Sequence, residues 1–165
     1  MSDLAQDLNA KAELMYGSTS VASLARAAVA DGGSAVLLFR LSKLVTRWGL
    51  TPLAWLLTKT NKVLNGITIG VGADIAPGFV IQHSVGVVIN GRAVIGPNCV
   101  LEGGVVIGSV ERRNPILEGN VYVGSGAKVI GGVRVGAGSK IGANSVVVKD
   151  VPAGVTVVGI PARVI

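Results

Sequence analysis

Aliphatic residues recur at every sixth position through the C-terminal two thirds of the chain. The longest block is Leu117, Val123, Val129, Val135, Ile141 and Val147, and earlier blocks are Ile69, Ile75 and Ile81, then Ile89, Ile95, Leu101 and Ile107. Neither a helix of 3.6 residues per turn nor an alternating strand produces a period of six. Three hexads form one triangular coil, so the pattern predicts a mainly-β fold, a parallel β-helix over residues 67–165 with a short C-terminal tail.

The third position after most of these aliphatic residues is Gly, Asn or Asp. These residue types tolerate the left-handed backbone of a tight corner. The corner residues predicted in this way are Gly72, Gly78, Asn98, Gly104, Asn120, Gly126, Gly132, Gly138, Asn144 and Asp150. The composition agrees with narrow repeated layers, because 24 of the 165 residues are Gly and only two each are Trp, Tyr and Phe.

The period of six breaks at two places. Ile89 follows Ile81 by eight positions, and Leu117 follows Ile107 by ten, so residues are inserted around 82–86 and 109–115. Loops on a rigid scaffold are where binding and catalytic residues concentrate, although tolerated insertions produce the same pattern. We therefore expect the functional residues in and beside these two loops.

Residues 1–66 hold no hexad phase and are predicted to form a small helical cap on the first coil. One helix is expected where Leu37, Leu38, Leu41, Leu44 and Val45 follow helical spacing and form the apolar face, with Arg40, Lys43 and Arg47 on other faces. A second begins at Thr51-Pro52, and one or two more precede Ala30. The alternative is a basic amphipathic surface that makes weak peripheral contact with a membrane.

Charge and cysteine content exclude several classes of protein. The net charge is +6, but the basic residues are scattered and lack aromatic stacking partners, so nucleic acid is not an expected partner. One His and one Cys cannot build a typical zinc site, so no metal is expected, and Cys99 occupies an inward-facing position of the repeat. No secretory signal and no apolar run of about 20 residues is visible, which favours a cytoplasmic location.

His83 is the only histidine and lies in the first phase break. A lone histidine is commonly structural, but a neutral imidazole where the chain leaves the regular coil can take a proton from an alcohol. No nucleophile elbow, phosphate-binding loop or dinucleotide fingerprint offers a competing chemistry. We therefore predict that His83 is a general base.

The repeat, the stretch from Ile81 to Ile89 and the ending Val158–Arg163 together resemble the serine acetyltransferase branch of the left-handed β-helix acyltransferases. This resemblance covers roughly residues 32 to 165. It implies a homotrimer with active sites between neighbouring subunits, and acetyl-CoA as a co-substrate lying along the β-helix, with no permanently bound cofactor. It also implies that His83 activates an acceptor hydroxyl while the backbone N–H of Gly108 stabilises the oxyanion. The positions that match the coenzyme A channel are Ser125, Ala143, Lys149 and Arg163.

The chain departs from the serine acetyltransferase pattern around the acceptor. Gln82 replaces an Asp before the base, Asn114 replaces a His between Arg113 and Pro115, and Asn90-Gly91 replaces a Gly-Glu pair. The carboxylate expected from the helical region would fall near residues 17–21, where no acid stands. The residues expected to bind the acceptor are therefore Gln82, Asn90, Arg113 and Asn114. The acids that could orient His83 are Glu13, Asp31, Glu102 and Glu111.

These departures remove negative charge that an amino-acid acceptor would need. Short helical N-termini and a run like Val87-Val88-Ile89-Asn90 resemble exopolysaccharide O-acetyltransferases of the colanic-acid type. We therefore predict an acetyl-CoA-dependent O-acetyltransferase that acts on a hydroxyl of a sugar or polysaccharide precursor. The alternatives are a serine O-acetyltransferase, an acyltransferase of another acceptor such as an antibiotic or amino-sugar, and a non-catalytic trimeric β-helix module.

Overall fold

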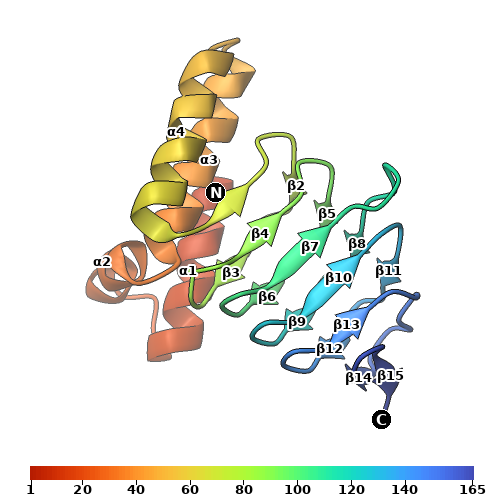
Figure 1. Ribbon diagram of the computed structural model, residues 1–165. Coiled ribbons are helices and arrows are strands. Elements are labelled where there is room, and N and C mark those ends of the chain that lie inside the picture. Colours follow the sequence, from red (N-terminus) through yellow and green to blue (C-terminus); the bar gives the residue numbers. More distant parts are fainter.

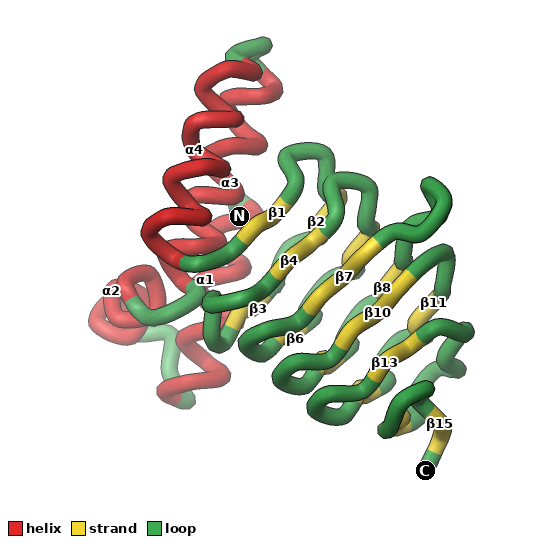
Figure 2. Tube along the Cα trace, in the orientation of Figure 1, coloured by secondary structure: helices red, strands yellow, loops and turns green.

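The computed structural model describes all residues from 1 to 165, and its elements fall into two parts (Figure 1). The N-terminal part is the four helices α1 (Asp3–Tyr16), α2 (Val21–Val29), α3 (Gly33–Arg47) and α4 (Thr51–Asn65). Fifteen short strands follow and wind into a prism whose three faces are sheets, with loops at the corners (Figure 2). This is the predicted β-helix with a helical cap.

Each face of the prism takes every third strand. The first sheet is β1 (Thr68–Ile69), β4 (Val88–Ile89), β7 (Val106–Gly108), β10 (Lys128–Ile130) and β13 (Val146–Val147). The second is β2 (Asp74–Ile75), β5 (Val94–Ile95), β8 (Ile116–Leu117) and β11 (Arg134–Val135). The third is β3 (Val80–Ile81), β6 (Val100–Leu101), β9 (Tyr122–Val123), β12 (Lys140–Ile141), β14 (Thr156–Val158) and β15 (Arg163–Val164). All pairs are parallel except β14 with β15.

The predicted hexad residues form the core of the prism. Ile69, Ile89, Ile107, Val129 and Val147 pair in register down the first sheet, and all are buried. Cys99 is also buried inside the stack, as its inward position predicts. The side chain that points inward from each strand therefore stacks on its equivalent in the next coil.

Two of the three corners use the predicted left-handed residues. Gly78, Asn98, Asn120 and Gly138 have positive φ between the second and third sheets, and Gly104, Gly126 and Asn144 have it between the third and first. The predictions for Gly72, Gly132 and Asp150 are wrong, because the corner between the first and second sheets turns without a regular left-handed residue. Glycine serves a different purpose there, since a Cβ on Gly70 would lie 2.4 Å from the Cα of Gly91 in the next coil.

A third phase break near the C-terminus escapes the sequence pattern. Val151 pairs with Val135, only four positions after Val147 rather than six. Val151 also stands four positions after the hexad residue Val147, where the repeat carries small or β-branched residues such as Val121 and Ala127, so the sequence did not reveal the shift. The last coil is therefore shorter than the others on the side that carries Lys149.

The helices close the first coil with polar contacts. Arg40 donates to the carbonyl oxygens of Ile75 (2.7 Å) and Ala76 (3.0 Å), and Lys43 donates to that of Ala73 (2.9 Å). These carbonyls lie at the end of the stack, where no further coil donates hydrogen bonds to them. Asp7 completes the cap by accepting from the backbone N–H of Phe79 (2.9 Å) and from Arg40 Nε (2.7 Å).

The predicted apolar face of α3 is only partly right. Its buried residues are Gly33, Ala35, Val36, Phe39, Ser42 and Val45, whereas Leu41 and Leu44 are exposed. Arg40 and Lys43 turn towards the first coil because its free carbonyls need donors, a requirement that hydrophobic spacing does not express. No single helix is both long and apolar enough to cross a membrane. Together, α2 and α3 have the length and composition of a membrane span, but the two helices meet at 83°.

Candidate active site

His83 lies on the loop that joins β3 to β4, where two residues are inserted into the repeat. Its side chain is 69% exposed, so a substrate can reach the imidazole. The next coil has a glycine at this level, since a Cβ on Gly103 would lie 3.2 Å from the Cβ of His83. The loop therefore projects the ring from a corner of the prism instead of burying it as a structural histidine.

A carboxylate from the helical part of the chain holds this loop. Asp31, between α2 and α3, lies 3.2 Å from His83 Nδ1 through Oδ2. Its other oxygen, Oδ1, accepts from Ser84 Oγ (2.6 Å) and from the Ser84 backbone N–H (3.1 Å). One side chain therefore fixes both the imidazole and the residue that follows it.

The hydrogen bonds at Asp31 decide the tautomer of His83. Partial burial acts to raise the pKa of Asp31, but the hydrogen bonds from Ser84 and His83 outweigh it and lower that pKa below its usual value. Asp31 is therefore ionised at neutral pH and can only accept hydrogen bonds. The proton of a neutral His83 must then lie on Nδ1, which leaves the lone pair of Nε2 free to take a proton from a substrate.

A buried lysine ties the Asp31 segment to the end of β3. Lys11 Nζ donates to the carbonyl oxygens of Asp31 (2.5 Å) and Ile81 (2.6 Å). Burial lowers the pKa of Lys11, while the nearby charges of Asp31 and Glu102 act in the opposite direction. The three segments that carry Lys11, Asp31 and His83 are thus joined by direct hydrogen bonds.

Two predicted coenzyme A positions lie on the same corner as His83, which we call the His83 edge. Going down the stack, this edge passes through Gly103, Ser125 and Ala143, because each turn between the third and first sheets lies below the previous one. Backbone hydrogen bonds link these levels, from Gly126 N–H to Gly103 O and from Asn144 N–H to Ser125 O. The edge offers a continuous track along the β-helix.

The other predicted residues follow the strands of the first sheet at its opposite side, which we call the Asn90 edge. Asn90 donates to Ser109 Oγ (3.1 Å), and Gly108 ends the strand β7 in the next coil. In the loop 109–115, Arg113 pairs with Glu111 (3.0 Å) and Asn114 donates to Arg112 O (2.9 Å). Within one chain, the first sheet separates these residues from His83, whereas Gln82 stands beside it.

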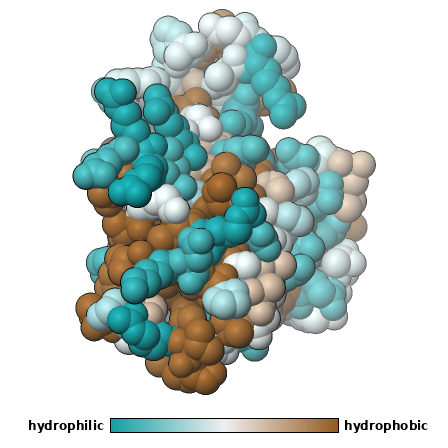
Figure 3. Space-filling model, turned by 90° about the vertical axis from the view of Figure 1, so that its right-hand side faces the viewer, coloured by the Kyte–Doolittle hydropathy of each residue, from teal (hydrophilic) through white to brown (hydrophobic).

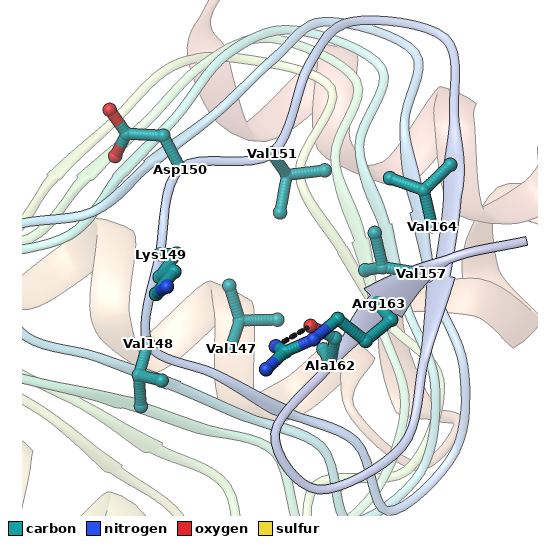
Figure 4. A pocket seen from close by; sticks show the side chains of 9 residues that line it. All are labelled: Val147, Val148, Lys149, Asp150, Val151, Val157, Ala162, Arg163 and Val164. Carbon is teal, nitrogen blue, oxygen red and sulfur yellow. Dashed lines mark hydrogen bonds between the residues drawn. The ribbon is translucent and has the colours of Figure 1, made fainter.

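Lys149 and Arg163 line one hollow at the far end of the stack. Figure 4 shows both side chains beside a hollow of about 280 Å³, with Val147, Val151 and Val157 on its floor and Asp150 turned away. Apolar side chains gather around this lower part of the molecule, crossed by hydrophilic ones (Figure 3). The hollow combines two cations with an apolar floor, a combination that suits a ligand carrying phosphate and a ring.

Of the four acids that the sequence leaves open as partners of His83, the structure places Asp31 at the imidazole. The orienting carboxylate therefore lies at Asp31 and not near residues 17–21. Glu102 adds a second carboxylate one coil below Gln82, since Ile81 pairs with Leu101. In the sequence, Asp31 is visible only as an acid before Gly32 and Gly33 at the start of a helix. This local pattern does not reveal that its partner, His83, lies 52 positions away.

The chain has the fold of the hexapeptide-repeat acyltransferases, a left-handed β-helix. Residues 114–149 match the family model for the bacterial transferase hexapeptide (six repeats). The chain is similar to the serine acetyltransferase of Synechococcus elongatus, with 40% identity over 138 residues, which cover 81% of this chain and 57% of that protein. It is 38% identical to the serine acetyltransferase of Helicobacter pylori strain 26695, over 81% of each chain.

Solved structures agree with the sequence relatives. A serine acetyltransferase in complex with cysteine has a TM-score of 0.90 and 28% identity, covering 99% of this chain and 68% of that one. The serine acetyltransferase of Brucella abortus strain S19 in complex with coenzyme A has a TM-score of 0.89 and 30% identity, covering 98% and 66%. The chain belongs to the serine acetyltransferase family.

The comparisons correct the narrower resemblance. The homologues are serine acetyltransferases and not exopolysaccharide O-acetyltransferases, so the predicted place in the colanic-acid subgroup is wrong. The short run Val87–Asn90 that suggested the subgroup belongs to the β-helix scaffold, where β4 pairs with its neighbours, and carries little information about the acceptor. The chain spans 57% and 54% of the length of the Synechococcus elongatus and Bacillus subtilis proteins.

Proposed function

We propose that this chain transfers the acetyl group of acetyl-CoA to the hydroxyl of serine, with His83 as the general base. The observation that carries the proposal is the contact between ionised Asp31 and His83 Nδ1, on a scaffold whose relatives are serine acetyltransferases. The carboxylate accepts the Nδ1 proton and so leaves Nε2 basic. It also stabilises the imidazolium that forms when Nε2 takes a proton.

The reaction is a direct transfer in which each proton has a place to go. His83 Nε2 removes the proton from the acceptor hydroxyl as the oxygen attacks the thioester carbonyl carbon. The tetrahedral oxyanion collapses, the carbon–sulfur bond breaks, and the imidazolium returns its proton to the thiolate of coenzyme A. The backbone N–H of Gly108, supplied by the Asn90 edge of a second copy, stabilises the oxyanion.

Acetyl-CoA would lie along the His83 edge, past Ser125 and Ala143, with its phosphates near Arg163. Lys149 follows β13 on the Asn90 edge, so it would reach these phosphates from the neighbouring chain of a trimer. Four coil rises of about 4.8 Å separate the level of His83 from the C-terminal end, a span of about 19 Å that suits an extended ligand. The relative from Brucella abortus is solved with coenzyme A, which supports this choice of donor.

The site requires two copies of the chain. His83 with Gln82, and Asn90 with Gly108, Arg113 and Asn114, lie on opposite edges of the first sheet, so they can face each other only across an interface between chains. Exposed aliphatic side chains on this part of the β-helix, among them Val85, Val88 and Val110, suit such an interface. A homotrimer places one edge of each copy against the other edge of its neighbour.

Serine is favoured over a sugar because a carboxylate stands beside His83 and a second lies in the next coil. Asp31 contacts the imidazole and Glu102 lies one coil below Gln82, so an ammonium group would find negative charge there. A sugar hydroxyl remains the second candidate acceptor, favoured by the neutral hydrogen-bonding side chains of Gln82, Asn90 and Asn114.

The test is release of free coenzyme A thiol from acetyl-CoA with serine and, separately, with sugars and nucleotide-linked sugars as acceptors. We expect turnover with serine and a loss of about 10²- to 10⁴-fold in His83→Gln, because the general base is removed. Val21→Ala, an exposed change on α2, is the matched control with unchanged activity. Turnover of sugars without turnover of serine would overturn the acceptor, and full activity in His83→Gln would overturn the mechanism.

A further inference from the structure

The outer side of α4 carries large apolar side chains that no other part of the chain covers. Asn61 donates to Ala35 O and marks the side that packs on α3. On the other side, Leu53, Leu56, Val63 and Leu64 are 42%, 58%, 82% and 71% exposed. Leu56, Val63 and Leu64 follow Leu53 by three, ten and eleven positions, so the four side chains lie along one stripe of the helix. An apolar stripe that faces outwards indicates that the helix packs against a surface outside this chain.

Both tryptophans of the chain lie where α3 and α4 meet. Trp48 is 67% and Trp55 63% exposed, and this end of the hairpin projects away from the β-helix (Figure 1). A shallow hollow of about 470 Å³ is formed there by Thr51, Pro52, Trp55, Leu56 and Lys59. Tryptophan is enriched where an apolar phase meets water, because its ring is apolar and its N–H is polar.

The charge of this hairpin has a single sign. Residues 32–73 contain no Asp or Glu but five cations, Arg40, Lys43, Arg47, Lys59 and Lys62. Arg40 and Lys43 bond to Asp7 and to the first coil, which leaves Arg47, Lys59 and Lys62 exposed. Lys59 Nζ stands 5.6 Å from the centre of the Trp55 ring. The apolar stripe is thus accompanied by cations without any carboxylate.

We infer that the α3–α4 hairpin docks on an anionic lipid bilayer surface, with α4 lying in the interface and its apolar stripe towards the acyl chains. An amphipathic helix with apolar and aromatic residues on one face and Lys on the flank binds membranes in this way. A second copy packed stripe against stripe would bring the same three exposed cations against each other with no acid on either side, and this arrangement repels. Anionic headgroups instead complement the cations.

The tryptophans make the inference directly measurable, because all tryptophan fluorescence comes from this hairpin. Vesicles of phosphatidylcholine with phosphatidylglycerol are compared with vesicles of phosphatidylcholine alone. We expect co-sedimentation and a blue shift with the anionic vesicles, weaker at high salt because screening removes the attraction. Val63→Glu should weaken binding by about tenfold or more, since it places a charge on the apolar stripe. Val21→Glu, the same change on an exposed valine of α2, should bind like the unaltered protein, and far-UV circular dichroism checks that both variants fold.

Three results would overturn the inference. The first is the absence of a spectral shift and of co-sedimentation with anionic vesicles. The second is binding that Val63→Glu leaves unchanged. The third combines two observations: the tryptophan spectrum is already blue-shifted without lipid, and light scattering shows that Val63→Glu dissociates the assembled protein. Together they would show that the stripe packs against a second chain. Acetyl transfer in solution does not depend on the apolar stripe. The thiol-release assay therefore tests the proposed acetyl transfer, and the vesicle experiments test membrane docking independently of it.

Discussion

Asp31 connects two functions that are usually divided between separate residues. Its Oδ2 contacts His83 Nδ1, and its Oδ1 holds the backbone and hydroxyl of Ser84. The orientation of the base and the shape of its loop therefore depend on the same carboxylate, which Lys11 in turn anchors through the Asp31 carbonyl. Asp31 is a positioning residue, since it acts on the substrate only through the imidazole.

Asp31→Asn is expected to lower kcat for acetyl transfer by about 10²- to 10⁴-fold, because a neutral amide neither imposes the Nδ1–H tautomer nor stabilises the imidazolium. Steady-state kinetics with acetyl-CoA and serine measure the effect, and the KM for acetyl-CoA should change little. Asp3→Asn, an exposed carboxylate of α1, is the control. Wild-type kcat in Asp31→Asn would remove Asp31 from the mechanism.

The lowered pKa of Asp31 also links stability to pH. The stability that its ionised form contributes is present above the usual pKa of an aspartate, 3.8, and is lost as the pH falls through the lower pKa of the folded protein. The difference in unfolding free energy between the unaltered protein and Asp31→Asn should therefore shrink below about pH 4. Urea unfolding at a series of pH values measures it, and a difference that does not shrink below about pH 4 would contradict the assignment.

Cys99 is expected to be unreactive in the folded protein. Burial raises the pKa of its thiol to about 11, so the thiolate that reacts with disulfide reagents is scarce and enclosed. An aromatic disulfide reagent at pH 8 should modify almost none of the folded chain and about one equivalent once it is denatured. Rapid labelling of the folded protein would show that the coil opens. The same property keeps thiol-release assays free of background from the protein.

Residue types at the site were more predictable than their partners. His83 could be identified because it is the only histidine and stands where the period of six fails. Asp31 could only be named as one of four candidate acids, because its contact with His83 joins a loop between helices to a loop of the first coil and depends on how the helices sit on the stack. Hydrophobic periodicity describes which side faces the core, and it contains no information about such a docking angle.

Among the elements, α3 shows how strongly free backbone groups can override hydrophobic spacing. Arg40 leaves the solvent to bond two carbonyls of the first coil and the buried carboxylate of Asp7. Because the helix turns this side towards the first coil, Leu41 and Leu44 are exposed. A helix that covers the end of a β-helix must bring donors with it, whereas a helix that covers a side-chain core needs only apolar residues.

Arg40→Met is expected to destabilise the protein by about 3–5 kcal/mol, because Asp7 would be left buried without its partner and the first coil would lose two donors. Arg47→Met, at an exposed position of the same helix, should change the unfolding free energy by no more than about 0.5 kcal/mol. Urea unfolding of both variants gives the comparison. Equal stability of the two would show that the Arg40 contacts contribute nothing net.

The strands were the most predictable elements, because each contributes a hexad residue at a fixed place. The two insertions were visible as spacings of eight and ten. The shortened last coil was missed because Val151 fits the repeat rule in two alternative phases, and only its pairing with Val135 distinguishes them. A sequence pattern with interchangeable small and β-branched residues is ambiguous wherever the register can slip by two.

At the scale of the whole molecule, the proposed site is divided between the two edges of the first sheet. A trimer that joins the His83 edge of one chain to the Asn90 edge of the next leads to a specific expectation. His83→Gln and Arg113→Ala should each impair activity alone. Co-expressed in equal amounts, they should recover up to about one quarter of normal activity, because about that share of interfaces joins two intact edges.

Tagged subunits purified together and assayed for thiol release measure this recovery. The control is the mixture of the two variants purified separately, which contains no mixed trimers if exchange is slow. Mixed trimers without recovered activity would place both residues on a site within one chain.

The helical cap described at the first coil has a consequence for how the protein behaves in a crowded solution. A β-helix ends in a row of open hydrogen-bonding groups, and such a row is a template on which another chain can continue the stack. Arg40, Lys43 and Lys11 occupy the carbonyls of that row, and at the other end β15 runs antiparallel and cannot be continued in register. The first coil and the third sheet of the last coil are therefore closed to further stacking, which opposes growth into a fibre.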